Sequence, residues 1–193
     1  MPIKEKPIIF NAEMIRSIMG GRKTQTRRIK KSEKSPYGAS GDQLWVREAA
    51  YISQPNFCDK LSATHIDPHG SCRMVGHVAS MDEDSIRCAE EYGVKKSPSI
   101  FMPRWASRIQ LSIVGVKTQE LQAISEDDAC AEGITRRAGP YILDFANLWD
   151  EINGKAGKRW CDNPEVWVIE FGVHWINSCP NLKETSNAET ESA

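Results

Sequence analysis

The sequence predicts an α+β fold in which short helices flank a mixed β-barrel. Segments rich in branched and aromatic residues, which are typical of strands, alternate irregularly with short segments whose apolar residues recur at helical spacing. With 193 residues and 40% hydrophobic content, the chain can bury one core of good size. No internal period of about 20 to 50 residues is visible, which excludes repeat architectures. We therefore expect a single domain over residues 1–176.

The first quarter of the chain predicts a strand, a helix and a second strand. Residues 7–10 are typical of a strand, and Asn11 is suited to cap a helix over about residues 12–19. Apolar residues in that segment fall at helical spacing, which predicts one buried face. Two glycines end the helix, and residues 21–28 are expected to form a loop. Residues 43–48 predict the second strand.

Residues 53–103 are expected to form an irregular insertion. Prolines interrupt the segment after Tyr51, and no periodicity persists through it. Residues 74–79 could return to the core as a strand, and residues 82–92 predict an acidic, solvent-facing helix.

The second half of the chain carries the strongest patterns. Residues 109–116 predict a strand, residues 141–152 an amphipathic helix, and residues 165–171 the clearest strand of the sequence. Residues 177–193 are polar, acidic and without periodicity, and are expected to be a disordered tail.

Positive charge is concentrated in one short segment. Residues 22–34 contain seven lysines and arginines against the single acid Glu33, whereas the whole chain has a formal net charge of -1. Segregated positive charge predicts an anionic ligand, with nucleic acid or a nucleotide as the first candidate. The alternative is a solvated basic loop.

Several classes of protein are disfavoured by composition. The chain has no run of about 18 apolar residues, so no membrane span is expected. Its first residues lack the apolar stretch of a signal peptide, and the six cysteines are scattered, which favours a cytoplasmic protein with free thiols.

The basic segment also carries a family motif. Gly21, Lys23, Thr26 and Arg28 match the G-x-K-x-x-T-x-R pattern of the ASCH domain family, which has a PUA-like β-barrel. Further parts of that family's pattern follow in order at Gly41–Asp42, 124–129, 133–134 and 168–171. The chain resembles the longer ASCH proteins often carried by phages and prophages, and it is related in motif to a small bacterial amidohydrolase that deacetylates 4-acetylcytidine.

This resemblance implies a catalytic set of Lys23, Thr26 and Glu132, with no metal or organic cofactor. A threonine hydroxyl needs a neighbouring base to become a nucleophile, and Lys23 can be that base if burial and nearby cations lower its pKa. A carboxylic acid could then protonate the departing amine and later activate water. Ser125 is a plausible N-cap for the short helix that ends near Glu132, with Asp128 as its partner three residues on.

A second group of residues is predicted to bind nucleic acid or substrate. Arg28 is either an anchor for an anion or a structural partner of a buried acid. Arg104 and Arg108 flank Trp105, which could stack on a base, although a tryptophan at the start of a strand is more often part of the core. The full predicted binding set comprises Arg22, Arg27, Arg28, Arg104, Trp105 and Arg108.

Four soft ligands lie in the predicted insertion. Cys58, His65, His69 and Cys72 could hold a structural zinc ion, but their spacing fits none of the usual zinc-finger patterns. A zinc ion held there would be structural, since the chemistry of Lys23, Thr26 and Glu132 needs no metal.

The sequence leaves three functions open. The first is hydrolysis of an amide on a modified nucleoside or an RNA base, with 4-acetylcytidine as the concrete substrate. The second is RNA binding without catalysis, through the basic segment and Trp105. The third is metal-independent ribonuclease action, in which a base activates a ribose hydroxyl and arginines stabilise the phosphorane. The expected partner is thus a modified nucleoside or RNA.

Overall fold

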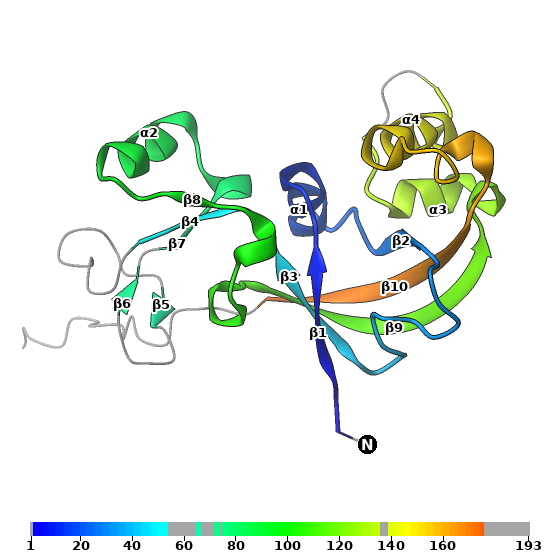
Figure 1. Ribbon diagram of the computed structural model, residues 1–193, viewed down its shortest axis with the longest axis horizontal. Helices are drawn as coiled ribbons and strands as arrows, with labels where there is room; N and C mark the ends of the chain where they lie inside the picture. The colour runs from blue at the N-terminus through cyan, green and yellow to red at the C-terminus, as the bar shows by residue number, and fades with distance from the viewer. Residues whose placement is uncertain (1, 54–64, 67–71, 74, 136–138, 176–193) are drawn as a thin grey trace, which may run out of the picture.

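A computed structural model describes residues 2–53, 65–66, 72–73, 75–135 and 139–175. Its centre is a five-stranded sheet in the order β1-β3-β9-β10-β2, in which β9 and β10 are long and strongly curved (Figure 1). The strands of this sheet are β1 (Glu5–Ile9), β2 (Gln25–Ile29), β3 (Gln43–Arg47), β9 (Ile109–Glu120) and β10 (Glu165–Trp175). Strands β1 and β3 are parallel, and the other neighbours are antiparallel. The mixed sheet and its flanking helices confirm the predicted α+β class.

Strand β2 corrects the prediction of a loop over residues 21–28. Residues 25–29 pair with the β10 segment from Val166 to Glu170, which gives them a full antiparallel ladder. Consecutive charged residues at 27 and 28 interrupt the polar–apolar alternation that marks a strand, and the burial of Arg27 depends on acids supplied by a distant helix.

Helix α1 (Ala12–Met19) forms as predicted between β1 and β2. The side chain of Asn11 accepts a hydrogen bond from the Met14 backbone N–H at 2.8 Å. Ile15 and Ile18 are fully buried against Phe10 in the core over the middle of the sheet. This packing fixes where the chain leaves α1 and therefore where the next residues, which carry the family motif, begin.

A second apolar core lies beneath the C-terminal helices. Helices α3 (Glu126–Ala131) and α4 (Tyr141–Asn153) pack together at the β2 end of the sheet (Figure 1). Phe145 and Trp149 of α4 are buried against Val166 and Val168 of β10. Ser125 caps α3 as predicted, accepting from the Asp128 N–H at 3.1 Å.

The predicted insertion contains regular structure in its described part. A small antiparallel sheet has the order β7-β4-β8, and helix α2 packs beside it on the other side of α1 from α3 and α4 (Figure 1). Its elements are β4 (Ala50–Ile52), β7 (Val75–His77), α2 (Glu83–Glu91) and β8 (Lys96–Ser97), while β5 (His65–Ile66) and β6 (Cys72–Arg73) form a separate pair. The predicted acidic helix is α2, whereas the predicted tail at 177–193 lies outside the described residues.

Short 3₁₀ turns connect these elements. They are η1 (Val78–Ser80), η2 (Ser99–Phe101), η3 (Arg104–Ala106), η4 (Leu121–Ala123) and η5 (Trp160–Asp162). Within the described ranges, every helix is too short or too polar to cross a membrane.

Candidate active site

The candidate active site is built where the end of α1, the start of β2 and the end of α3 meet. Lys23 pairs with Glu132 through an isolated antiparallel bridge, and the hydroxyl of Ser17 donates to the Gly133 carbonyl at 3.0 Å. Gly133 has a φ of +80°, and a Cβ placed there would lie 2.7 Å from Lys23 Cβ and 2.8 Å from Ser17 Cβ. A residue with a side chain would therefore separate the three segments, so glycine is needed for the close approach.

Lys23 and Glu132 form a buried ion pair. The ammonium of Lys23 donates to Glu132 Oε2 at 2.8 Å and also to the Glu132 backbone carbonyl at 2.8 Å. Their side chains are 0% and 5% exposed. The two residues lie 109 positions apart in the chain, so only the tertiary fold brings this base and this acid together.

Arg27 extends the ion pair into a network. Its guanidinium donates to Glu132 Oε1 at 3.0 Å and to Asp128 Oδ2 at 3.0 Å. Gln25 donates to the Asp128 backbone carbonyl at 2.6 Å and to Asp128 Oδ1 at 3.1 Å. Side chains alternate along a strand, so Gln25 and Arg27 share the face of β2 that meets α3.

Burial sets the protonation behaviour of this network. It lowers the pKa of Lys23, and the attraction of Glu132 and the hydrogen bond to it only partly oppose that effect. Arg28 and, to a smaller extent, Arg27 lower the Lys23 pKa further. Burial acts to raise the pKa of Asp128, but the hydrogen bond from Gln25 and the charge of Arg27 outweigh it and hold that pKa below its usual value. Lys23 is thus easier to deprotonate than an ordinary lysine, as its proposed role requires.

Thr26 and the ion pair line the same cavity. This cavity measures about 30 Å³ and is bounded on its far side by Phe145, Leu148 and other residues of α4. An adjoining hollow of about 60 Å³ shares Glu132 and Leu148 and continues toward α1. Pockets that hold small molecules are usually about 300–1,000 Å³, so this cavity as it stands is smaller than a nucleoside needs.

Arg28 lines the same cavity as Lys23 but has other hydrogen-bond partners than Arg27, and Arg22 lies at the surface. Arg28 donates to the carbonyl of Ile9 at 2.7 Å and its guanidinium lies 5.2 Å from the centre of the Phe10 ring. Burial lowers the pKa of Arg28. Since β1 and β2 are the outer strands in the sheet order, Arg28 bridges the two edges of the curved sheet. Arg22 is exposed and contacts the Ser17 hydroxyl at 3.4 Å.

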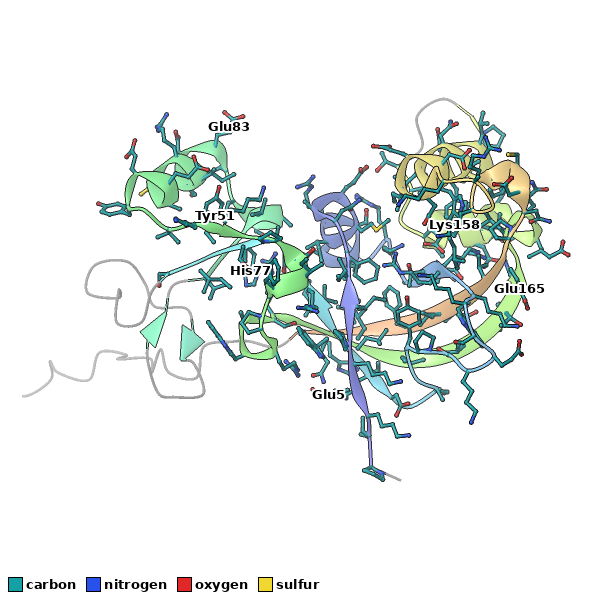
Figure 2. The ribbon with its side chains drawn as sticks, viewed as in Figure 1. Glu5, Tyr51, His77, Glu83, Lys158 and Glu165 are labelled. Carbon is teal, nitrogen blue, oxygen red and sulfur yellow. The ribbon has the colours of Figure 1, made fainter. Side chains whose placement is uncertain are left out.

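The predicted cluster around Trp105 lies elsewhere in the molecule. Arg104 contacts Glu5 at 2.9 Å, and Arg108 donates twice to the buried Glu48, at 2.9 and 3.0 Å. Trp105 is partly buried against the small apolar core next to β4 and β7. In Figure 2, Glu5 and His77, another contact of Glu48, lie well away from the α3–α4 end that Lys158 marks. None of the three predicted residues lines either cavity beside Glu132.

The predicted zinc ligands are only partly described. Cys58 and His69 lie outside the described residues, whereas His65 and Cys72 lie on the paired strands β5 and β6. Among the residues that the structure describes, no group of three metal-binding side chains converges.

The site includes two residues that were not predicted to take part in it, Asp128 and Gln25. Asp128 was predicted only as a capping partner, yet it is also the second acid bound by Arg27. Asp128 and Glu132 are four residues apart, and Gln25 and Arg27 are two apart. Helical spacing of the acids and strand spacing of their donors are signals that could have predicted the network.

Comparisons with known proteins add structural similarities of low identity. A scan against protein-family models finds no match, and a search of curated proteins finds none. A DUF984 protein from Enterococcus faecalis matches with 12% identity and a TM-score of 0.46, over 98% of this chain and 88% of that one. An ASCH domain from Lactobacillus crispatus matches with 12% identity and a TM-score of 0.43, over 90% and 81%. At these values neither structure indicates the activity of this chain.

Proposed function

We propose that this protein hydrolyses an amide on a modified nucleoside or RNA base, with 4-acetylcytidine as the substrate to test first. The observation that carries the proposal is the 2.8 Å contact between Lys23 Nζ and Glu132 Oε2 in a buried cavity that Thr26 also lines. A buried base, an acid within hydrogen-bond distance and a hydroxyl in one cavity are the parts that acyl transfer needs.

The proposed reaction begins with neutral Lys23. Its amine takes the proton of the Thr26 hydroxyl while the threonine oxygen attacks the acetyl carbonyl carbon and forms a tetrahedral intermediate. Collapse of this intermediate breaks the bond between the carbonyl carbon and N4 of the base. The departing nitrogen receives the proton from Lys23, either directly or through Glu132 Oε2, and the acetyl group remains on Thr26 as an ester.

Water completes the cycle. Glu132 accepts a proton from a water molecule, whose oxygen attacks the ester and forms a second tetrahedral intermediate. When this intermediate collapses, acetate leaves and the proton held by Glu132 returns to the Thr26 oxygen. The lowered pKa of Lys23 supports the first step, since it raises the fraction of neutral amine near pH 7.

The distribution of cations favours this function over RNA binding. Lys23 and Arg27 are committed to internal acids, Arg28 to a backbone carbonyl, and Lys30 to Glu165 at 3.0 Å. Cations neutralised in this way add little to phosphate binding, which depends on accessible positive charge. Four of the seven basic residues at positions 22–34 are therefore already paired within the molecule, whereas Arg22, Lys31 and Lys34 are exposed.

Turnover of 4-acetylcytidine to cytidine, followed by chromatography, tests the proposal. Thr26→Ala should lower kcat by about 100-fold or more with little change in substrate affinity, because it removes only the nucleophile. Thr118→Ala, at an exposed position on β9, is the matched control and should keep full activity. Equal turnover by Thr26→Ala and the control would rule out the threonine nucleophile, and no turnover by the wild type would leave the RNA-binding and ribonuclease alternatives.

A further inference from the structure

The Arg27 guanidinium holds two acids at once. Its side chain is 0% exposed, and its two terminal nitrogens each lie 3.0 Å from a carboxylate oxygen, one on Glu132 and one on Asp128. The planar fork of arginine suits this bridge, because Asp128 and Glu132 are four residues apart on one side of the helix end. Gln25 in turn holds Asp128, so the guanidinium is held in place from both directions.

The Glu132 carboxylate therefore contacts two cations of different kinds. Lys23 occupies Oε2 and Arg27 occupies Oε1. A lysine can lose its proton in a buried site, whereas an arginine stays charged in proteins. If Lys23 were the sole partner, its deprotonation would leave a buried carboxylate without a counter-charge, and the two groups would retain one shared proton. Arg27 removes that obstacle because its charge remains after Lys23 becomes neutral.

We propose that Arg27, held in place by Asp128, is a positioning residue that lets Lys23 release its proton beside an ionised Glu132. This inference rests on the proposed function, in which neutral Lys23 receives the proton of Thr26. It also changes the role predicted for Arg27 from substrate binding to support of the catalytic base. Arg28 also repels the Lys23 ammonium, but its guanidinium is directed to the Ile9 carbonyl and the Phe10 ring, whereas Arg27 contacts the Glu132 carboxylate.

The pH dependence of Lys23 reflects charges from every element around it. Strand β2 contributes Arg27 and Arg28, and the end of α3 contributes Asp128 and Glu132. Across the adjoining hollow stand two further acids, Glu13 of α1 and Asp144 of α4. Arg28 repels the Lys23 ammonium more strongly than Arg27 does, but Arg27 is the cation that contacts the Lys23 partner directly, so its removal also takes away the counter-charge that remains on Glu132 when Lys23 becomes neutral.

The test compares wild type with Arg27→Met and Arg27→Lys, using 4-acetylcytidine across a range of pH. The methionine keeps much of the buried volume and removes the charge. We expect the ascending limb of kcat/KM to move upward by about one pH unit in Arg27→Met, which lowers the neutral fraction of Lys23 about tenfold at a fixed pH. KM should change by less than about twofold, because both terminal nitrogens of Arg27 are already bound by Glu132 and Asp128.

Arg27→Lys keeps a positive charge but lacks the two-pronged guanidinium. The ascending limb of kcat/KM in this variant should therefore lie close to its wild-type pH position. The matched control is Arg87→Met, which removes an arginine from an exposed ion pair on α2 and should leave the profile unchanged. A limb that stays in place in Arg27→Met would overturn the proposal, and so would a large rise in KM with an unchanged limb.

Asp128→Asn provides a second test if Arg27→Met does not fold. The Asp128 side chain is 30% exposed, so its loss is less disruptive. The direct effect of removing this carboxylate is to lower the Lys23 pKa, so an upward shift of the ascending limb can arise only if Arg27 is no longer held beside Glu132. We expect a small upward shift, and a limb that moves downward would contradict the positioning of Arg27 by Asp128.

Titration of the lysine side chains by NMR separates this proposal from the proposed function. The signal of Lys23, assigned from Lys23→Met, should have a higher midpoint in Arg27→Met than in wild type even if no acetylated nucleoside is turned over. A wild type without turnover but with this shift would refute the amidohydrolase and retain the positioning role. An unshifted midpoint would refute the positioning role whatever the activity.

Discussion

Glu132→Gln should reveal how strongly the buried ion network depends on one carboxylate. The substitution keeps the size of the side chain and removes its charge, leaving Lys23 and Arg27 without their shared acid. At 2.8 Å, the gross attraction between Lys23 and Glu132 is about 6 kcal/mol for an effective dielectric constant of about 20. The variant no longer has to desolvate a carboxylate, which offsets much of this loss, so we expect a net destabilisation of about 3–5 kcal/mol near neutral pH.

The sign of the pH dependence follows from Lys23. Its folded pKa lies below the ordinary value of 10.5, so the unfolded chain binds more protons between these two values, and stability rises with pH across that interval. Glu132→Gln removes the acid that opposes this shift, so the interval widens. The gap in stability between wild type and the variant should therefore narrow as pH rises and Lys23 becomes neutral in the folded state.

Urea unfolding at several pH values measures this effect directly. The difference in unfolding free energy between wild type and Glu132→Gln should be largest at the lower pH values, where Lys23 is charged in the folded state of both proteins. Glu151→Gln, an exposed change on α4, is the matched control and should leave the free energy of unfolding unchanged. A loss below about 1 kcal/mol that does not vary with pH would refute the buried ion pair as the organising contact of the site.

Two further changes test other parts of the structure. Gly133→Ala should destabilise the fold by about 2 kcal/mol or more, because the positive φ is strained and the methyl group meets Lys23 and Ser17; a thermal melt equal to wild type would contradict this close approach. Glu48 is buried, and although burial raises its pKa, its hydrogen bonds, including those from Arg108, hold that pKa below 4.5. The ionised Glu48 carboxylate thus stabilises the fold above pH 4.5, and this contribution is lost as pH falls through the folded pKa. Glu48→Gln should therefore have a lower melting temperature than wild type at neutral pH and a smaller decrease of the melting temperature in acid. Calorimetry that finds the same dependence of melting temperature on pH in both proteins would contradict this prediction.

Local patterns were sufficient to predict most elements of the fold. After Asn11 the apolar residues recur at helical spacing, and the segment from Glu165 onward is rich in branched and aromatic residues, as is typical of a strand. Both signals can be detected from the sequence because capping and residue pattern depend on residues only a few positions apart. Strand β2 was missed because one of its two arginines, Arg27, is buried through ion pairs with a helix about 100 residues later. The pattern of a strand cannot show partners that lie so far along the chain.

The motif placed Lys23, Thr26 and Glu132 on the list of candidates, and the residue types alone suggested their chemistry. The tertiary structure decided which cations are available to a ligand and which serve the protein itself. In the sequence, the basic segment indicates a positively charged surface. In the fold, Lys23 and Arg27 are withdrawn from water and neutralised by Glu132 and Asp128, since a buried charge is tolerated only beside its counter-charge.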